Sequence, residues 1–316
     1  MIPNYYRPVM KEMLSEILEI SERAWYCYEN SRNISLPPGV PFLGMGSSYF
    51  AALILKYCGI EIYPEIASEY FNYISQGKIN PMGVLISQSG ESSETLWCRE
   101  LFQKIIAITN EAESSLAKSP NIKELIMLNA GREDYSSTKT YINTLVVLYN
   151  GFKIDIRHAL ENLDAKLEMY REWGEKTAIE LGEYIGKEKI NGISFIGSGP
   201  NIATAYQAAL TFSETTKMPA AGLPLSQYDH GPKESSPGSI VFLIQSEGTS
   251  FKRANQLTET LSYAGAQVIP VEELSLPEIL SPFSTIVRIN FLSFYLAKEL
   301  GIKRTFDVGR KITRVE

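Results

Sequence analysis

Three short segments rich in hydroxyl side chains each come after an apolar run in the first half of the chain. They are Gly46-Ser47-Ser48, Ser87-Gln88-Ser89-Gly90-Glu91-Ser92 and Ser136-Ser137-Thr138. Hydroxyl donors, backbone N–H groups and the positive end of a following helix together bind small anions such as phosphate. Serine and glycine after a strand are also ordinary turn residues, so a single segment of this kind is equally well explained by turn chemistry. Three such segments in one half of the chain favour a phosphate-binding cradle.

Other ways of binding phosphate are less well supported. No Gly-x-x-x-x-Gly-Lys-Ser/Thr sequence occurs, which excludes a Walker loop. The turn Gly44-Met45-Gly46 lacks the third glycine of the dinucleotide fingerprint and is only a weak indication of such a site. With 30 Lys and Arg against 36 Asp and Glu, the net charge of −6 makes the chain a poor binder of nucleic-acid backbones. We therefore expect a small phosphate compound in a dedicated pocket.

Few side chains of the chain are suited to proton transfer near neutral pH. Only two histidines occur among the 316 residues. His230 lies in the loop sequence Tyr228-Asp229-His230-Gly231-Pro232, and a loop histidine beside an aspartate suits proton transfer. His158 lies in a charged helical stretch, which favours a surface position. Glu214 also lies in a helical stretch, where a glutamate is usually solvated or forms a salt bridge.

Glycine turns connect apolar strands to helices in the pattern of a parallel α/β sheet. The sequence predicts a strand at Val40–Leu43 and, after a glycine turn, a helix at Tyr49–Tyr57. It then predicts a strand at Met82–Ile86, a helix at Ser93–Gln103 and a strand at Ile105–Ile108. Ligands of such sheets bind beyond the carboxyl ends of the strands, where the hydroxyl-rich segments are expected to gather.

The second half of the chain repeats the first. Gly197-Ser198-Gly199-Pro200 matches Gly44-Met45-Gly46-Ser47 at a distance of 153 positions. Strands predicted at Ile193–Ile196, Ile240–Ile244 and Val268–Val271 continue the likeness. An internal repeat of this size indicates two tandem α/β domains. The turns of the second half carry fewer hydroxyl groups, so a full phosphate site is expected only in the first.

The predicted organisation has five parts. Apolar residues at helical spacing predict a helix near the N-terminus, and a charged periodic stretch between the repeats predicts a long linking helix. A basic tail follows the last helical segment. The expected boundaries are 1–35 for the N-terminal helix, 36–154 for the first α/β domain, 155–186 for the linking helix, 187–302 for the second α/β domain and 303–316 for the tail.

The composition is that of an ordinary folded protein, with 44% apolar and 21% charged residues. No apolar run approaches the roughly 18 residues of a membrane-spanning helix, and the N-terminus lacks an apolar signal core. Cys27, Cys58 and Cys98 have no metal-like spacing and indicate a reducing compartment. We therefore expect a cytoplasmic protein with no metal site, no other cofactor, and no nucleic-acid or membrane partner.

Together these motifs resemble the sugar isomerase (SIS) family, and within it the isomerase half of glucosamine-6-phosphate synthase. The resemblance covers nearly the whole chain in the same order. Ser-Gln-Ser-Gly-Glu-Ser combined with His-Gly-Pro and a lysine five positions before the end is a specific combination. The matching sequences are Gly44-Met-Gly-Ser-Ser-Tyr49, Ser87-Gln-Ser-Gly-Glu-Ser92, Ile108-Thr-Asn110, Ser114-Ser-Leu116, Ala130-Gly131, Ser136-Ser-Thr-Lys139, Gly197-Ser-Gly199, Glu214, His230-Gly-Pro232 and Lys311.

The resemblance implies two SIS domains, each a five-stranded parallel sheet flanked by helices, and a site for a 6-phosphosugar. Glu214 matches the base that moves a proton between C1 and C2. Lys311 matches a lysine near the C2 carbonyl, which stabilises an oxyanion or forms an imine. His230 matches a ring-opening histidine from the neighbouring subunit, which implies a homodimer with a shared site. The residues that the resemblance implies as substrate ligands are Gly46, Ser47, Ser48, Ser87, Gln88, Ser89, Ser92 and Ser137.

Two departures from the synthase bear on the expected function. The chain reaches the first predicted strand by Leu43, which leaves no room for the glutaminase domain. Gln207 and Thr211 stand where the synthase has a glutamate and a lysine. We therefore predict an SIS-type glucosamine-6-phosphate deaminase, which gives fructose 6-phosphate and ammonia. The alternatives are a fructosamine-6-phosphate deglycase, a galactosamine-6-phosphate deaminase, a plain aldose–ketose isomerase, or a sugar-phosphate sensor without catalytic activity.

Overall fold

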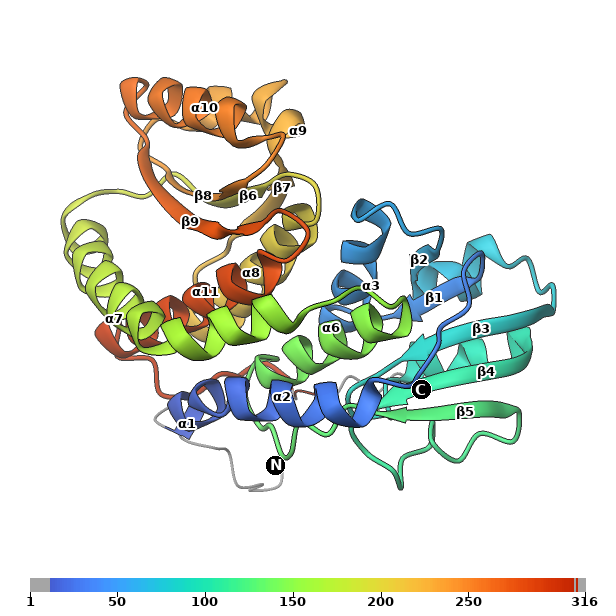
Figure 1. The fold of residues 1–316 in the computed structure, drawn as a ribbon. Coiled ribbons are helices and arrows are strands. Elements are labelled where there is room, and N and C mark those ends of the chain that lie inside the picture. Colours follow the sequence, from blue (N-terminus) through green and yellow to red (C-terminus); the bar gives the residue numbers. More distant parts are fainter. Residues whose placement is uncertain (1–11, 310, 312–316) are drawn as a thin grey trace.

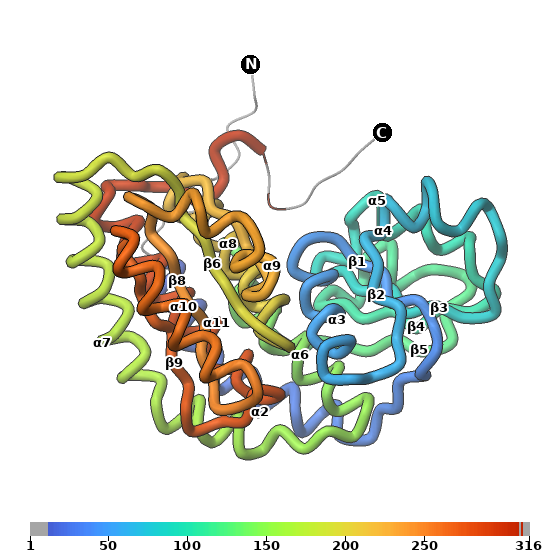
Figure 2. Tube along the Cα trace, turned by 90° about the horizontal axis from the view of Figure 1, so that it is seen from above, coloured from blue at the N-terminus to red at the C-terminus, as the bar shows by residue number. Residues whose placement is uncertain are grey.

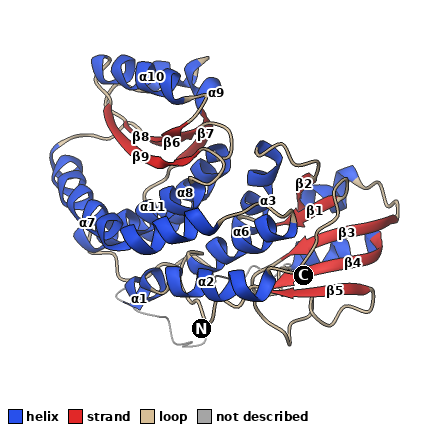
Figure 3. Cartoon of the chain, viewed as in Figure 1, coloured by secondary structure: helices blue, strands red, loops and turns tan. Residues whose placement is uncertain are grey.

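The computed structural model describes residues 12–309 and 311 and contains two parallel β-sheets with helices between and around them (Figures 1 and 3). The first sheet has the strand order β2-β1-β3-β4-β5, and the second has the order β7-β6-β8-β9. Figure 2 shows the first sheet on the right and the second on the left. The strands are β1 (Pro41–Gly44), β2 (Tyr63–Ile66), β3 (Asn80–Ile86), β4 (Phe102–Thr109), β5 (Ile122–Met127), β6 (Ile193–Gly197), β7 (Ala221–Pro224), β8 (Ile240–Glu247) and β9 (Gln267–Pro277).

The helices fill the space between the sheets and cover their outer faces (Figure 3). No helix within residues 12–309 is long and apolar enough to cross a membrane. The α-helices are α1 (Met13–Leu18), α2 (Ile20–Ser31), α3 (Ser47–Tyr57), α4 (Ala67–Glu69), α5 (Ser93–Trp97), α6 (Lys139–Gly151), α7 (Arg157–Lys187), α8 (Asn201–Thr216), α9 (Leu225–Asp229), α10 (Phe251–Tyr263) and α11 (Pro282–Glu299). Single-turn helices are η2 (Tyr70–Ile74), η3 (Cys98–Leu101) and η4 (Pro232–Ser235).

The two sheets are built on the same plan, as the sequence repeat predicts. In each sheet the first strand along the chain lies between the second and the third. Each first strand ends in a glycine against which the next helix packs closely. A Cβ atom at Gly44 would lie 2.8 Å from the Cβ of Ser48, and one at Gly197 would lie 2.1 Å from the carbonyl oxygen of Asn201. The repeated glycines therefore permit the same strand-to-helix turn twice.

The prediction of five strands in each sheet holds for the first sheet and is wrong for the second within the described residues. The second sheet has four strands, and β9 forms its edge. Only the residues from Glu278 to Ser281 separate β9 from α11. Four residues are too few for a crossover helix and a further parallel strand, so the sheet ends there.

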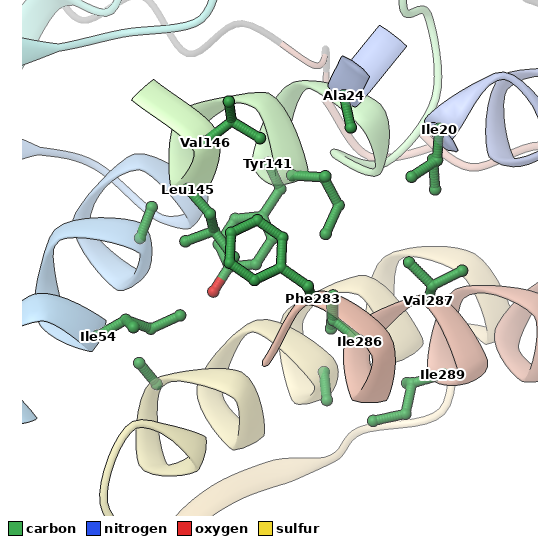
Figure 4. Close-up of a cluster of buried hydrophobic side chains, with 14 of the residues drawn as sticks. Ile20, Ala24, Ile54, Tyr141, Leu145, Val146, Phe283, Ile286, Val287 and Ile289 are labelled. Carbon is green, nitrogen blue, oxygen red and sulfur yellow. The ribbon is translucent and has the colours of Figure 1, made fainter. Parts of the chain in front are cut away.

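One large hydrophobic core is shared by both sheets. Apolar side chains of β3 and β4 alternate between this shared core and a second core on the outer face of the first sheet. Those of β8 alternate in the same way with an outer core of the second sheet. Such burial on both faces is typical of parallel sheets. Figure 4 shows the middle of the shared core, to which Tyr141 of α6, Ile54 of α3 and Phe283 of α11 all contribute. The division of the chain into two separate domains stays a prediction.

The sequence did not predict three edge strands, and it made one helix too long. The strands β2, β5 and β7 lie at sheet edges, and their partly exposed residues lack a continuous apolar run. Helix α5 ends at Trp97, and β4 begins at Phe102, inside the helix predicted at Ser93–Gln103. The consecutive β-branched residues Ile105 and Ile106 favour extension of the strand.

A buried carboxylate fastens the linking helix α7 to β9. Glu273 is 1% exposed and accepts hydrogen bonds from Tyr170, Lys166 and Ser275. Burial alone would raise the pKa of this carboxyl, but the bonds from Ser275, Tyr170 and Lys166 outweigh it and lower the pKa to about 2.

This lowered pKa predicts a loss of stability in acid. The contribution of Glu273 is present above the pKa of the unfolded carboxyl, near 4.5, and is lost as the pH falls towards about 2. It is on the order of 3 kcal/mol at neutral pH. Urea unfolding of wild type and Glu273→Gln will therefore give a difference in free energy that shrinks as the pH is lowered. A difference independent of pH would contradict the assignment.

Candidate active site

A cavity of about 280 Å³ lies at the carboxyl edge of the first sheet, where ligands of parallel sheets bind. Helix α8, which packs against α3, and the C-terminal segment complete its wall. In Figure 2 the red C-terminal segment runs from the side of the second sheet towards the first. The lining residues are Met45, Gly46, Ser47, Ser48, Gln88, Ser89, Ser92, Glu94, Ser137, Thr140, Tyr141, Thr144, Leu210, Glu214, Phe306 and Lys311. The cavity therefore contains every site residue predicted from the sequence except Ser87 and His230.

The loop after β3 is held in place by the loop after β4. The backbone N–H of Asn110 donates a 2.9 Å bond to the carbonyl of Gln88, and the hydroxyl of Thr109 donates another to the same oxygen. The Glu91 carboxylate accepts bonds of 2.7 and 3.1 Å from the N–H and hydroxyl of Ser115. These bonds fix the loop, so that Ser89 and Ser92 are placed at the cavity before any ligand binds.

Ser87 lies beneath this loop and does not line the cavity. Its side chain is 3% exposed, and its hydroxyl donates to the hydroxyl of Ser92 at 3.3 Å. Its role in the geometry is therefore to orient Ser92. Ser47 and Ser48, which also line the cavity, form the first turn of α3, so the positive end of this helix faces the cavity. Two serine segments and one helix terminus thus surround the same space.

Gly90 is the position at which this loop tolerates no side chain. Its φ angle is +63°, and a Cβ atom there would lie 2.0 Å from the Ser114 hydroxyl oxygen. Gly77 has the same backbone conformation, with φ +70°, but no atom within 4 Å of the corresponding Cβ position. Substituting alanine at each glycine in turn therefore distinguishes the effect of backbone strain, present at both, from that of a steric clash, present only at Gly90.

We predict that Gly90→Ala will weaken binding of inorganic phosphate by about tenfold or more, because the loop must move to relieve the clash. Gly77→Ala will lower stability by about 1 kcal/mol and leave phosphate binding unchanged. Isothermal titration with phosphate and thermal unfolding of both variants provide the test. Equal phosphate affinity in the two variants would show that the loop after β3 does not bind phosphate.

Glu214 enters the cavity from the last turns of α8. Ser136 donates a hydrogen bond to its carboxylate and also contacts Thr215 at 3.1 Å. Burial raises the pKa of Glu214, and the carboxylate of Glu133 adds to this rise, whereas Ser136, Lys311 and Lys217 act in the opposite direction. The net pKa lies above the usual carboxyl range. A carboxyl with a raised pKa in a cavity wall is suited to take and return a proton.

Gln207 and Thr211 serve to attach the loop before α6 to α8. The side-chain amide of Gln207 donates to the hydroxyl of Thr211 at 3.0 Å and to the carbonyl of Ser137 at 3.3 Å. All three residues are buried or partly buried. Neither Gln207 nor Thr211 lines the cavity, and together they form an uncharged brace that holds the loop carrying Ser137.

Lys311 reaches the cavity from the C-terminal segment and is held by a buried glutamate. Its ammonium group donates to the backbone carbonyl of Glu133 at 2.7 Å and to the carboxylate of the same residue at 3.0 Å. The Glu133 side chain is 0% exposed. An ammonium group fixed in this way can stabilise negative charge that develops on a bound molecule.

Glu133 is a site residue that the sequence pattern did not identify. Besides Lys311, its carboxylate accepts bonds from the N–H groups of Thr138 and Thr140 and from both of their hydroxyls. Burial would raise the pKa of this carboxyl, but the Lys311 charge and the hydrogen bonds keep the pKa below its usual range. Glu133 therefore remains charged and joins Lys311 to the loop that carries Ser137.

A second buried carboxyl supports the same loop from the N-terminal helix. Glu16 of α1 is 7% exposed and accepts bonds from the backbone N–H groups of Asp134, at 2.7 Å, and Tyr135, at 3.4 Å. Burial and the nearby Glu133 carboxylate raise the pKa of Glu16 to about 7. Its hydrogen bonds to the loop therefore change in strength around neutral pH.

His230 lies outside this cavity. It is exposed and caps α9, which begins directly after β7 of the second sheet. The neighbouring Asp229 contacts Lys233 at 3.0 Å and Arg253 at 2.8 Å. The aspartate beside His230 in the sequence thus belongs to an ion-pair cluster with Lys233 and Arg253. Within the described residues, no group of three His, Cys, Asp or Glu side chains is arranged to hold a metal ion.

Residues 39–150 match the protein family described as SIS domain. A glutamine–fructose-6-phosphate aminotransferase (isomerizing) of Sulfolobus acidocaldarius is 29% identical over 283 residues, covering 82% of this chain and 47% of that protein. The protein of the same name from Methanocaldococcus jannaschii is 26% identical, covering 97% of this chain and 30% of that protein. The chain thus spans about half, or less, of the length of these relatives.

Solved structures with the same fold cover almost the entire chain. The C-terminal domain of glucosamine-fructose-6-phosphate aminotransferase from Francisella tularensis superposes with a TM-score of 0.77 at 20% identity, covering 96% of this chain and 99% of that one. A glucosamine-6-phosphate deaminase from Thermotoga maritima gives a TM-score of 0.71 at 21% identity, covering 92% and 96%. At these identities the similarity establishes the fold.

Proposed function

We propose that this chain, whose residues 39–150 are a SIS domain, binds a phosphorylated hexose in the serine-lined cavity and moves a proton between its C1 and C2 atoms. One observation carries the proposal: the carboxyl of Glu214 and the ammonium group of Lys311 line the same cavity as the two serine segments. Phosphate requires hydrogen-bond donors, which the serines supply. Aldose–ketose interconversion requires one carboxylate that takes and returns a proton.

The substrate that we propose is glucosamine 6-phosphate, with fructose 6-phosphate and ammonia as products. The names of the relatives join fructose 6-phosphate to amino transfer and isomerisation. The deaminase reaction is the same sugar chemistry run in reverse, so that ammonia is released. Gln207 and Thr211 support this choice over amino transfer, because they stand where the synthase that the chain resembles has a glutamate and a lysine.

In the proposed reaction the open-chain amino sugar loses the proton on C2 to the Glu214 carboxylate. The electrons form a C1–C2 double bond, and the charge that develops on O1 is stabilised by the Lys311 ammonium group. Glu214 then returns the proton to C1, O1 takes up a proton from the nitrogen, and a neutral imine is left at C2. Water adds to this imine, and ammonia leaves to give the ketone of fructose 6-phosphate. The raised pKa of Glu214 suits both directions of transfer.

The test is to incubate the protein with glucosamine 6-phosphate and to measure ammonia and fructose 6-phosphate together. Equal amounts of both products support the deaminase proposal, and unphosphorylated glucosamine serves as the control for the phosphate site. Fructosamine 6-phosphate and galactosamine 6-phosphate are tested in parallel. Turnover of one of these alone, interconversion of hexose phosphates without ammonia, or binding without turnover would instead support the deglycase, isomerase or sensor alternatives.

Ring opening requires a further proton carrier, and we propose that His230 of the partner subunit supplies it in a homodimer. The exposure of His230 and its position outside the cavity of its own chain agree with this assignment. Light scattering will then show a dimer. A monomer with full activity would refute the shared site.

A further inference from the structure

Lys217 is bonded both to the helix that carries Glu214 and to the C-terminal segment that carries Lys311. It lies at the end of α8, three residues after Glu214. Its ammonium group donates to the carbonyl of Glu214 at 2.9 Å and to the carbonyl of Thr305, and it lies 3.8 Å from the carboxylate of Asp307. One side chain therefore connects α8 to the C-terminal segment, two parts of the site that are 88 positions apart at the bonded residues Lys217 and Thr305.

The backbone at Lys217 is one that favours glycine. Its φ angle is +64° and its ψ angle 7°, the left-handed conformation in which most α-helices prefer glycine after their last residue. A side chain in this conformation carries a steric cost that glycine avoids. A lysine at a helix end can donate to one of the last carbonyls, as Lys217 does to that of Glu214, but the helix end does not explain its second bond, to Thr305.

Those contacts make the C-terminal segment a strap with two anchors. The strap, residues 305–309 and 311, is held at one end by Lys217 through the carbonyl of Thr305. At the other end the ammonium group of Lys311 is bonded to Glu133. Phe306, between the two anchors, lines the cavity. Thr305 is 4% exposed, so the first anchor lies in a buried part of the strap.

We propose that Lys217 is a positioning residue that latches this strap over the cavity and thereby places Lys311 and Phe306 against the bound sugar. The expected kinetic effects rest on the proposed function. The contacts by which Lys217 holds the strap do not depend on it. Lys217 acts on the reaction through Lys311 and Glu214. The charged groups that face Glu214 are the ammonium groups of Lys217 and Lys311 and the carboxylate of Glu133.

Three substitutions at this position separate latching from folding. Lys217→Gly and Lys217→Met both remove the ammonium group, but only glycine relieves the left-handed backbone. Lys217→Arg keeps a cation that can donate to both carbonyls. Lys187→Met is the matched control, because Lys187 ends α7 and its ammonium group contacts the exposed Glu183. Thermal unfolding, hydrogen exchange of the peptide that contains the strap, and kinetics with glucosamine 6-phosphate are measured for each.

We expect faster hydrogen exchange in the strap and a 10- to 100-fold lower kcat/KM in both Lys217→Gly and Lys217→Met, the range of a hydrogen bond to a charged group. Of the two, Lys217→Gly will have the higher melting temperature, although its kcat/KM falls as much as that of Lys217→Met. The acid limb of the pH profile will move to higher pH, because a cation near Glu214 has been removed. Lys217→Arg and Lys187→Met will behave as wild type.

Two results would overturn the proposal. One is unchanged exchange of the strap in Lys217→Gly and Lys217→Met. The other is activity that follows the melting temperature across the variants, with no recovery in Lys217→Arg. If no sugar phosphate is turned over by the wild type, the proposed function fails, and hydrogen exchange alone still decides whether the latch exists.

Discussion

Replacing Glu214 by glutamine will stop proton transfer between C1 and C2 while the sugar phosphate still binds. The amide has nearly the same size as the carboxyl and can still accept the bond from Ser136, but it cannot take a proton. General base catalysis contributes up to about 10⁴-fold, so we expect a loss of about 10³-fold or more in kcat. The phosphate donors lie on other elements, so the dissociation constant of the sugar phosphate will change little.

The measurement is exchange of the C1 and C2 hydrogens of the sugar phosphate in deuterated water, followed by NMR, with binding measured by calorimetry. Glu180→Gln, at an exposed position on α7, is the control. Deuterium exchange near the wild-type rate in Glu214→Gln would remove Glu214 from its role as base. In the wild type, the raised pKa of Glu214 predicts that kcat/KM increases with pH through that pKa, since only the carboxylate takes a proton.

Replacing Lys311 by methionine will lower both activity and stability. Loss of the ammonium group removes the group that stabilises charge on the sugar oxygen, at a cost of about 10²- to 10³-fold in kcat. It also leaves the carboxylate of Glu133 buried without a cation, which costs about 3 kcal/mol. Kinetics and urea unfolding at neutral pH measure the two effects separately.

A second substitution distinguishes these two effects. In the Lys311→Met background, Glu133→Gln removes the unpaired buried charge and will recover most of the lost stability. It will not recover activity, because the ammonium group is still absent. Recovery of activity along with stability would mean that Lys311 acts only as a structural partner of Glu133. A Lys311→Met protein as stable as wild type would contradict the charge pair itself.

Sequence patterns predicted those parts of the fold that are specified locally. The central strands carry uninterrupted apolar runs, and glycine turns mark where each helix follows, as at Gly44 and Gly197. The edge strand β5 could not be predicted in this way, because most of its residues are partly buried or exposed, and its partner β4 determines where it pairs. The second sheet has four strands among the described residues because the connection between β9 and α11 is too short for a fifth, and the sequence pattern did not show this.

The candidate site was predictable to the extent that its residues form contiguous motifs. The serine segments stand out because their hydroxyl groups are close together in the sequence. Glu133 does not stand out, because its partner Lys311 lies 178 positions away, and the bond from Ser136 to Glu214, 78 positions away, is equally hidden in the sequence. In the sequence Lys217 looks like an ordinary lysine at a helix end, and only its backbone angle and its bond to Thr305 give it a role in the site. Such roles become visible only when the chain is folded.

The bond between Lys311 and Glu133 also has a consequence for the order in which the protein matures. The two residues are 178 positions apart, and both sheets are complete in the chain before Lys311. A ribosome adds the C-terminal strap after the strands β1 to β9 of the described residues have been synthesised. A nascent chain can therefore form its sheets and its serine segments while the ammonium group of Lys311 is still missing. If the proposed function holds, such a chain would hold phosphate without performing chemistry, and catalytic competence would arrive only once Lys311 has left the exit tunnel.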